Sequence, residues 1–526
     1  MALSVNAKKG LVFGIGAALL VIGCVIGGVW LVIVASILEA QMGLTGTSTS
    51  FSLWEETPVP MYIEVYFFDW INAAEFQQNP HNVTPAFAEM GPYVFSEHHS
   101  KVNIAWNPNN TVTFQQIRRW HFVPERSNGT LRDEVTNINT IAVTVEYMIR
   151  HMNPMVQIVV DALVKSLEPM FVTKTVGQLM FEGYEDELLN ITARLNISDF
   201  QVPFDKFGWF YPRNNSPTYD GVFNMHTGTD DIHVLGMMDA WNYEQNPPYY
   251  DGQCSRITGS TGELLPPVEN LDKIGLFAPE ICSSLELVKS DNSISRYGLE
   301  GYKFYGDDSV FDNGTKYPEK RCFCAKGQLL GTADISASVE ECVPSGVRGI
   351  SKCRFGAPAF VSFPHFYQAD PSYVSNIIGL NPSQDLHEFY LAVEPYTGIP
   401  LEVKARMQIN LLLRPYKNSK LFKDVPRVMV PILWFTQSVE LTPDLADLAK
   451  LLVKLPAIGL TIFFGLAGIG ALLIVSGIVI TLRNGWEGEE GDKLLGHESS
   501  SFVTPIVRNV NGDNNEERKI TTDEED

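Results

Sequence analysis

The sequence predicts an α+β membrane protein in which two transmembrane helices flank one large ectodomain. Residues 11–38 and 455–482 carry no charged side chain, and each run exceeds the roughly 20 apolar residues that a helix needs to cross a bilayer. Every N-x-S/T sequon and all cysteines but one lie between these runs. The predicted order is a tail (1–10), a span (11–38), the ectodomain (39–454), a span (455–482) and an acidic tail (483–526).

The first apolar run has two interpretations, a cleaved signal peptide or an uncleaved signal anchor. Signal-peptide cores contain about 7–15 apolar residues, and this run is nearly twice as long, which favours the anchor. Lys8 and Lys9 precede the run and favour a cytosolic N-terminus. With two spans, both tails then lie in the cytosol.

The distribution of sequons supports a luminal or extracellular ectodomain, since N-glycosylation requires the secretory pathway. A proline follows the sequons at Asn82 and Asn214, which makes these two the weaker candidates. The predicted glycosylation sites are Asn82, Asn109, Asn128, Asn190, Asn196, Asn214 and Asn313.

Six cysteines share one window of the ectodomain, residues 254–353, and the seventh, Cys24, lies in the first span. An even number in a luminal segment predicts three disulfides, although the sequence alone does not choose the pairing. A zinc site is the less favoured alternative, because no His lies within this window. The disulfide-forming residues are Cys254, Cys282, Cys322, Cys324, Cys342 and Cys353.

The net charge of −22 argues against nucleic acid as a partner. The C-terminal tail contributes −7 of this charge, so most of the excess belongs to the ectodomain. We find none of the sequence motifs of nucleotide loops, zinc proteases or serine hydrolases, and His98-His99 is interpreted as a solvated pair. We therefore expect no enzyme, no metal site and no cofactor.

Most of the ectodomain is predicted to form short strands, for example Tyr62–Phe68, Thr111–Ile117, Phe389–Val393 and Glu402–Leu413. Residues 140–189 instead have a helical period. Met155–Leu167 is predicted to be a helix that starts at Pro154 and has Val156, Val159, Val160, Leu163 and Leu167 on one face, and a second helix is predicted over Thr175–Leu189.

The wide apolar face of the helix Met155–Leu167 also has two interpretations. It packs inside a small helical bundle, or part of it binds a ligand or partner. On the second interpretation the candidate ligand-binding residues are Lys165, Asp161, Val156, Val160 and Leu163. Asp161 and Lys165 are four residues apart and could pair along the helix.

Ordered motifs over most of the ectodomain resemble those of the class B scavenger receptor family, which includes fatty-acid translocase and the type-two lysosomal integral membrane protein. They are Gly91-Pro-Tyr93, Asp251-Gly-Gln-Cys254, Thr258-Gly-Ser-Thr-Gly262, Pro266-Pro267, Cys353-Arg-Phe-Gly-Ala-Pro-Ala-Phe-Val-Ser-Phe-Pro-His-Phe366, Ala369-Asp-Pro371 and Pro395-Tyr-Thr-Gly-Ile-Pro400.

This resemblance implies an antiparallel, β-barrel-like body with an apical helical bundle at residues 140–189, and a lipophilic tunnel that leads towards the bilayer. It also implies the disulfides Cys254–Cys322, Cys282–Cys353 and Cys324–Cys342. Lys165 falls where an apical lysine contributes to ligand capture in some members. Leu167 and Glu168 beside it imply an apex less basic than in members that bind anionic lipoprotein.

The acidic tail contains Glu490, Leu494 and Leu495 in the spacing of an acidic dileucine signal, which clathrin adaptors bind. An ordinary disordered tail is the alternative interpretation.

The resemblance favours a receptor that takes up lipid or lipoprotein-like particles by endocytosis and lipid transfer, at the plasma membrane and in endosomes or lysosomes. The alternative is a sorting receptor for a soluble luminal protein. Small residues in both spans also suit contact between the spans or between copies in a homo-oligomer.

Overall fold

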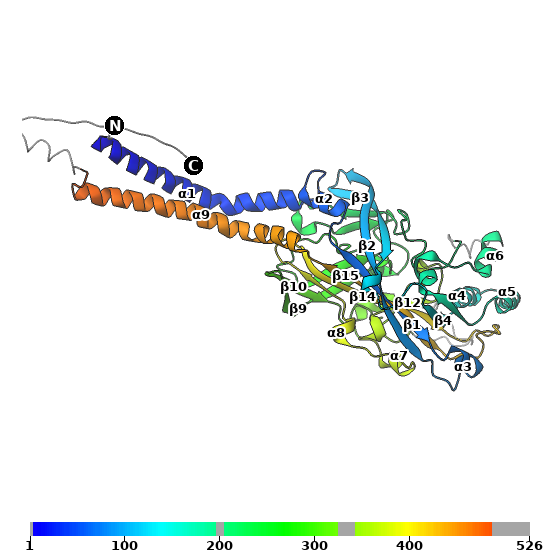
Figure 1. Cartoon of the computed structure of the whole chain (residues 1–526). Helices are drawn as coiled ribbons and strands as arrows, with labels where there is room; N and C mark the ends of the chain where they lie inside the picture. The colour runs from blue at the N-terminus through cyan, green and yellow to red at the C-terminus, as the bar shows by residue number, and fades with distance from the viewer. Residues whose placement is uncertain (1–3, 196–204, 325–341, 487–526) are drawn as a thin grey trace, which may run out of the picture. The chain divides into compact units, whose positions relative to one another are not determined.

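The computed structural model describes residues 4–195, 205–324 and 342–486 and divides into two compact units (Figure 1). The first unit combines Met1–Trp30 with Ile458–Asp526, and the second is Leu31–Ala457. The first therefore holds most of both apolar runs, and the second holds most of the predicted ectodomain.

The predicted pair of apolar terminal helices is confirmed. The helices are α1 (Val5–Met42) and α9 (Pro443–Leu482), and both are long and apolar enough to cross a membrane. With 38 and 40 residues and a rise of about 1.5 Å per residue, each is longer than a hydrocarbon core of about 30 Å. α1 extends past the predicted span 11–38 at both ends, and α9 extends past the predicted span 455–482 at its N-terminal end.

Within the first unit, glycines bring the two helices into close contact. A Cβ atom on Gly23 would lie 2.5 Å from the carbonyl oxygen of Phe463, and one on Gly470 would lie 2.5 Å from the backbone nitrogen of Leu20. A Cβ on Gly28, by contrast, would have no atom within 4 Å. Some of the small residues noted in the sequence thus permit contact between the spans of one chain.

The second unit is built on one 13-stranded antiparallel sheet with the main strand order β7-β6-β3-β2-β1-β15-β14-β13-β10-β9-β8. β12 pairs with β14 and β11 with β12. The strands are β1 (Met61–Trp70), β2 (Phe87–Asn107), β3 (Thr111–Phe122), β6 (Phe223–His226), β7 (Met238–Trp241), β8 (Lys273–Ala278), β9 (Ser283–Arg296), β10 (Leu299–Tyr305), β11 (Arg348–Gly349), β12 (Ala359–Ser362), β13 (Tyr390–Val393), β14 (Pro400–Leu413) and β15 (Val428–Glu440).

Alternating side chains give this sheet its interior. Along β1, Met61, Ile63, Val65 and Phe67 are all buried, as expected where every second residue of a strand faces the core. The four strand segments predicted from the sequence lie within β1, β3, β13 and β14, except that Phe389 directly precedes β13. Along the chain, the short helix α2 (Thr49–Glu55) precedes β1, and others lie between strands: α3 (Ala73–Gln78), α7 (Pro371–Ser375) and α8 (Gln384–His387).

The segment Thr258–Gly262 joins the two ends of the sheet. Beside β7, the N–H of Met238 donates to Gly259 O at 2.8 Å, and within β8, the N–H of Phe277 donates to Ser260 O at 2.7 Å. This one motif thus contacts both edge strands, so that the sheet nearly closes into a barrel. Closure removes free strand edges, which would otherwise template aggregation.

The predicted helical region is partly helical. α4 (Thr140–Ile149), α5 (Pro154–Leu167) and α6 (Glu187–Leu195) lie together at one end of the sheet, and we call these three helices the helical cap (Figure 1). The predicted single helix over 175–189 is wrong. β5 (Phe171–Thr175) pairs with β4 (Glu134–Ile138), a π-helical turn spans Gln178–Glu182, and Gly183 breaks the helix with a φ of 68°.

The period in that region nevertheless identified core residues. Val176, Leu179, Met180 and Tyr184 are all buried, although they do not share one helix. Periodicity reports which side chains face the core, whereas the backbone leaves the helix at Gly183 and Tyr184 then pairs with Phe207.

Candidate functional site

A cavity of about 560 Å³ lies inside the second unit. It is bounded at one end by α4, α6 and residues 207–213 of the chain, and its lining continues along the sheet to Met61 and Val439. These two residues face each other where β1 begins and β15 ends. The size is typical of a site for a small organic ligand.

Most of the lining is apolar and comes from the strands. The residues that form this surface on the central strands are Ile63, Ala359, Val361, Leu391, Val403, Ala405, Met407, Ile409, Leu411, Phe435 and Val439. Because their alternate neighbours face away, a continuous apolar surface runs along β14. On β15, Phe435 and Val439 extend this surface on either side of Gln437, which also lines the cavity.

One wall of the cavity is charged. His99 lies between two carboxylates, with Nε2 at 2.6 Å from Glu97 Oε1 and Nδ1 at 2.6 Å from Glu263 Oε1. Each ring nitrogen thus faces a carboxylate oxygen. Lys101 Nζ contacts the other oxygen of Glu263 at 2.6 Å.

The same wall continues through two arginines. Arg213 Nε lies 2.8 Å from Asp220 Oδ1, and its Nη2 lies 2.5 Å from Glu280 Oε1. Arg118 contacts Asp220 at 3.2 Å, Glu280 at 3.2 Å and Glu97 at 3.5 Å. We call these eight side chains the buried charge network: Glu97, His99, Lys101, Arg118, Arg213, Asp220, Glu263 and Glu280.

The network holds the carboxylates of Glu97 and Glu280 ionised. Burial alone would raise the pKa of the Glu97 carboxyl, but His99 and Arg118 lower that pKa to about 2. Burial likewise opposes ionisation of Glu280, and Arg213 and Arg118 hold its pKa well below the usual range. Both carboxylates therefore keep their charge at the pH of an acidic compartment.

The sequence analysis missed this network, and its interpretation of His99 as solvated is wrong. His99 is 3% exposed, whereas the side chain of its neighbour His98 is 44% exposed and lies beside Glu56. A signal was present: Glu97, His99 and Lys101 are alternate residues of one strand and must share a face. Their partners come from distant segments that no local pattern indicates.

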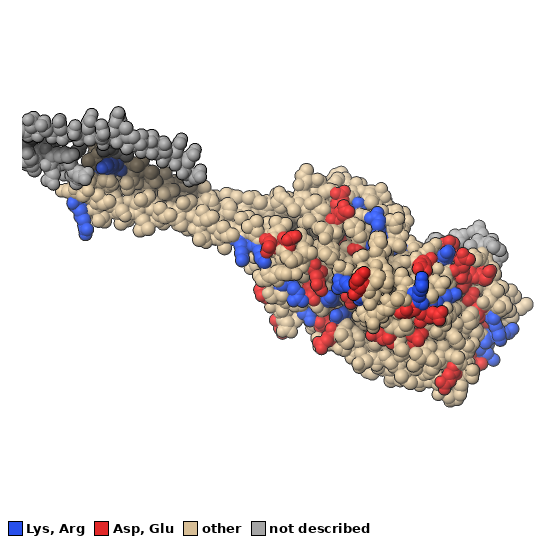
Figure 2. Space-filling model, viewed as in Figure 1, with Lys and Arg blue, Asp and Glu red and all other residues tan. Residues whose placement is uncertain are grey.

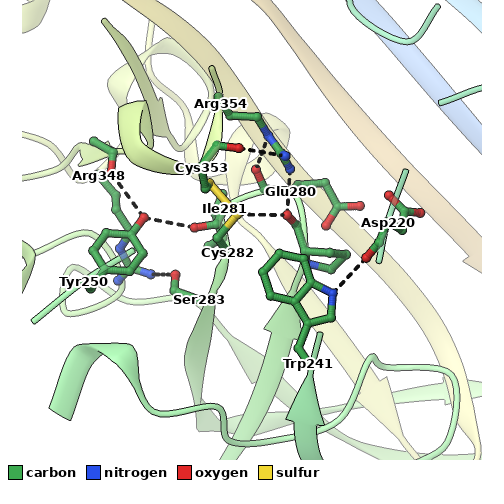
Figure 3. Close-up of a disulfide and its surroundings, with 12 residues drawn as sticks. Asp220, Trp241, Tyr250, Glu280, Ile281, Cys282, Ser283, Arg348, Cys353 and Arg354 are labelled. Atoms are coloured by element: carbon green, nitrogen blue, oxygen red, sulfur yellow. Dashed lines mark hydrogen bonds between the residues drawn. A yellow bond between two sulfur atoms is a disulfide. The ribbon is translucent and has the colours of Figure 1, made fainter. Parts of the chain in front are cut away.

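The structure contains three disulfides, Cys254–Cys322, Cys282–Cys353 and Cys324–Cys342, the pairs that the family resemblance implies. Figure 3 shows that Cys282–Cys353 joins two segments of the cavity wall. One carries Glu280, and the other carries Arg354, which donates to Glu280 O at 3.1 Å and to Pro279 O at 2.6 Å. The cross-link thus fixes the wall in place.

A second polar cluster explains the end of the motif 353–366. His365 Nε2 lies 2.6 Å from Glu89 Oε2, and Trp434 Nε1 donates to the same oxygen at 2.7 Å. The His365 ring stacks on His387 with centroids 4.4 Å apart. Burial and His365 lower the pKa of His387 to about 4. None of these residues lines the cavity, so the cluster connects β2, β15 and the segments around residues 365 and 387 structurally.

The predicted ligand-binding residues on α5 do not share one surface. Asp161 is 1% exposed and points into the cap, where its Oδ1 accepts from the N–H of Lys420 at 2.7 Å. Lys165 is exposed, so the predicted pair of these two residues is wrong. Val160 and Leu163 are half-buried against the core, and Val156 is 41% exposed.

The outer face of α5 is nevertheless apolar. Its most exposed large apolar side chains are Met155 at 73%, Val159 at 69% and Ile158 at 49%. This face is displaced from the predicted one because α5 packs inward through Val164 and Asp161. A buried aspartate so close to the expected apolar stripe is a feature that hydrophobic period alone does not reveal.

That the apex is less basic than in members that bind anionic lipoprotein stays a prediction, and the structure adds a group of exposed lysines beside α5. The connection from β14 to β15 packs against α5, since Asn418 Nδ2 donates to Gln157 Oε1 at 2.7 Å. This connection places exposed basic residues near Lys165, and Figure 2 shows basic side chains at the edge of the molecule where Figure 1 places α5. Within the described residues, no ion pair is found for Lys165, Lys417, Lys420 or Lys423.

Inside the cap, two buried carboxyl groups face each other. Glu146 of α4 is 2% exposed, and burial together with the neighbouring Asp161 raises its pKa to about 8. Ser419 also contacts this carboxyl and acts in the opposite direction. The folded cap therefore binds a proton at neutral pH that the unfolded chain releases near pH 4.5, the ordinary value for glutamate.

This proton makes the cap more stable in acid. Between about pH 4.5 and pH 8 the folded state binds more protons than the unfolded state, so stability falls as the pH rises. We expect the unmodified protein to lose more than about 1 kcal/mol of stability between pH 5.5 and pH 8.5 relative to Glu146→Gln, which cannot titrate. Thermal unfolding of both proteins at the two pH values measures this, and equal pH dependence would contradict it.

The predicted glycosylation sites differ in exposure. Asn82, Asn109, Asn128 and Asn214 are exposed, and Asn190 is half-buried. Asn313 is 4% exposed and its Nδ2 donates to Val343 O at 2.5 Å, so a glycan there would displace local packing. Asn196 and the sorting residues Glu490, Leu494 and Leu495 lie outside the described residues. Among the described residues no group of three or more His, Cys, Asp or Glu is arranged to hold a metal ion.

The two terminal apolar helices, the disulfide-linked strand domain and its apolar cavity define a membrane-anchored binding protein. The model of the CD36 family matches residues 14–481, and the chain belongs to this family. It is 34% identical to Protein peste of Drosophila melanogaster over 82% of this chain and 76% of that one.

Two vertebrate relatives are covered more completely. The chain is 31% identical to Scavenger receptor class B member 1 of Mus musculus over 94% of this chain and 96% of the relative. It is 28% identical to Lysosome membrane protein 2 of Homo sapiens over 90% of this chain and 92% of the relative. The resemblance to class B scavenger receptors that the motifs indicate is thereby confirmed.

Proposed function

We propose that this protein is a receptor that captures lipid-bearing particles at its helical cap and transfers lipid through the cavity towards the membrane. Membership of a scavenger receptor family supports a lipid or lipoprotein receptor in general terms. The observation that carries the specific proposal is the apolar lining, which continues from α4 to Met61 and Val439.

The surface of the cap supports capture of such a particle. Exposed apolar side chains of α5 lie on the same helix as Lys165, and the neighbouring connection adds three further lysines. Apolar groups enter the lipid surface, and lysines attract anionic head groups at about 1 kcal/mol each near a charged membrane. The favoured cargo is therefore a particle with an anionic lipid surface.

Blocking the cavity separates transfer from capture. Ala405 lines the cavity between Val403 and Met407 on β14. Ala405→Trp should reduce the transfer of a fluorescent neutral lipid from anionic phospholipid vesicles into expressing cells by about tenfold or more, because the indole obstructs the apolar passage. Vesicle binding at the cell surface should stay unchanged, since the cap is untouched.

Lys404→Trp provides the control. Lys404 is the neighbour of Ala405 on the same strand, faces the other way and does not line the cavity. Its ammonium lies 3.5 Å from the exposed Glu440, a contact worth little. Both variants are compared at equal surface amounts. Unimpaired transfer by Ala405→Trp would rule out the cavity as the route.

A sorting receptor for a soluble luminal protein is the second candidate, and the exposed apolar face of α5 favours it. Capture of a protein at this face needs no open cavity. A partner that binds Ala405→Trp as well as the unmodified chain, while neither protein transfers lipid, would support this candidate.

The proposed location is the plasma membrane and endosomal or lysosomal membranes, with both termini in the cytosol. Lys8 and Lys9 before the first span and the exposed sequons between the spans support this orientation. Clathrin adaptors that bind Glu490, Leu494 and Leu495 would direct endocytosis, and a homo-oligomer remains compatible with the small residues of the spans.

A further inference from the structure

The cationic side chains that line the cavity are all engaged by the protein itself. Arg118 and Arg213 contact the carboxylates of Asp220 and Glu280, and Arg354 donates to backbone carbonyls. His99 faces a carboxylate on each ring nitrogen. Within the described lining, a ligand therefore meets no unpaired positive charge.

The charged wall presents carboxylates to the cavity more than cations. The side chain of Glu280 is 28% exposed and that of Glu263 is 16% exposed, compared with 12% for Arg118 and 8% for Arg213. All four residues line the cavity, and Glu280 lies on the cross-linked segment shown in Figure 3. Among the network residues that line the cavity, the two most exposed side chains thus carry hydrogen-bond acceptors.

An anionic head group is poorly accommodated beside such a wall. It would lose its hydration without gaining a cation, and it would lie close to ionised carboxylates. A hydroxyl group is better accommodated, because it is uncharged and donates one hydrogen bond to a carboxylate oxygen. The rest of its chain can then lie on the apolar surface of β14 and β15.

We propose that the cavity selects a neutral long-chain lipid that carries a hydroxyl group, with Glu280 as the acceptor of that hydroxyl, and rejects the same chain when it ends in a carboxylate. This inference rests on the proposed function, since it requires that the cavity binds lipid. It assigns a specificity-determining role to a residue that the sequence motifs did not indicate.

Three probes with the same 18-carbon chain test this selectivity: oleyl alcohol, methyl oleate and oleate. The full-length glycosylated chain is purified in detergent, each unlabelled probe competes with radiolabelled oleyl alcohol at pH 8, and bound label is counted after micelles are removed. We expect oleate to bind at least about tenfold more weakly than oleyl alcohol. Methyl oleate, which is neutral but cannot donate, should bind with intermediate affinity.

Glu280→Gln tests the residue itself. The change removes the negative charge beside Arg213, although the amide oxygen still accepts from the guanidinium. The wall then repels a carboxylate less, so oleate should bind at least about tenfold more tightly than to the unmodified chain. Glu286→Gln, an exposed change on β9, is the matched control and should leave the three affinities unchanged.

The possible outcomes separate this inference from the proposed function. Oleate binding as tight as that of oleyl alcohol to the unmodified chain would overturn the selectivity, while the lipid cavity would stand. Methyl oleate binding as tight as the alcohol would overturn the role of the hydroxyl donor. No binding of any probe would contradict the proposed function and this inference with it. The comparison of probes needs no variant, so a folding defect in Glu280→Gln cannot obscure it.

Discussion

Gly259→Ala is expected to abolish folding of the strand domain. Gly259 has a φ of +81°, which costs an L-residue about 1–2 kcal/mol. An added Cβ would also collide with the backbone of Gly275, which cannot rotate away as a side chain would. The two segments would have to separate, and the hydrogen bond from Ser260 N to Gly275 O at 3.1 Å would be lost.

Gly298→Ala separates the effect of the positive φ angle from the effect of the steric collision with Gly275. Gly298 has a φ of +80°, almost the same as Gly259, but a Cβ there would meet no atom within 4 Å. We expect Gly298→Ala to lower the thermal midpoint only slightly and Gly259→Ala to prevent recovery of monodisperse protein from a glycosylating host. Similar losses in both variants would show that the backbone angle, and not closure of the sheet, is responsible.

Lys101→Met is expected to destabilise the protein by about 3–5 kcal/mol, because it leaves part of the charge on Glu263 buried and uncompensated. The Lys101 side chain is fully buried, and its Nζ lies 2.6 Å from Glu263 Oε2. Burial lowers the pKa of Lys101 even though Glu263 opposes this effect. Burial would raise the pKa of Glu263, but Lys101 and His99 hold that pKa well below its usual range.

The double variant Lys101→Met with Glu263→Gln distinguishes charge from packing. Removing both charges leaves no unpaired ion, so most of the stability lost in Lys101→Met should return. Chemical unfolding of the unmodified chain, the two single variants and the double variant measures the coupling between the residues. A double variant as unstable as Lys101→Met would show that the methylene packing of the lysine matters more than its charge.

The local pattern of apolar and polar residues predicted the helices and strands correctly where that pattern extended over many residues. The apolar runs appear as α1 and α9, and the alternating segments 62–68 and 402–413 lie in β1 and β14. The prediction failed over 175–189, where the helix ends at Gly183 and Tyr184 pairs with Phe207 instead of continuing the helical period. The predicted role of Asp161 also failed, because this residue is buried and accepts a hydrogen bond from Lys420 N–H. A hydrophobic period shows which face of a helix packs on the core, but it does not show which polar side chain is buried there with a partner.

The sequence by itself determined the membrane anchors, the number of disulfides and the family. These follow from the two uncharged apolar runs, the number of cysteines and the ordered motifs along the chain. Only the tertiary structure decided how charges pair. His99 meets Glu263 across a separation of 164 residues, and Glu89 meets Trp434 across 345. The first contact depends on the closure of the sheet, and the second depends on the pairing of β1 with both β2 and β15. Both bring segments together whatever their distance in sequence, and the selectivity proposed for the cavity depends on such contacts.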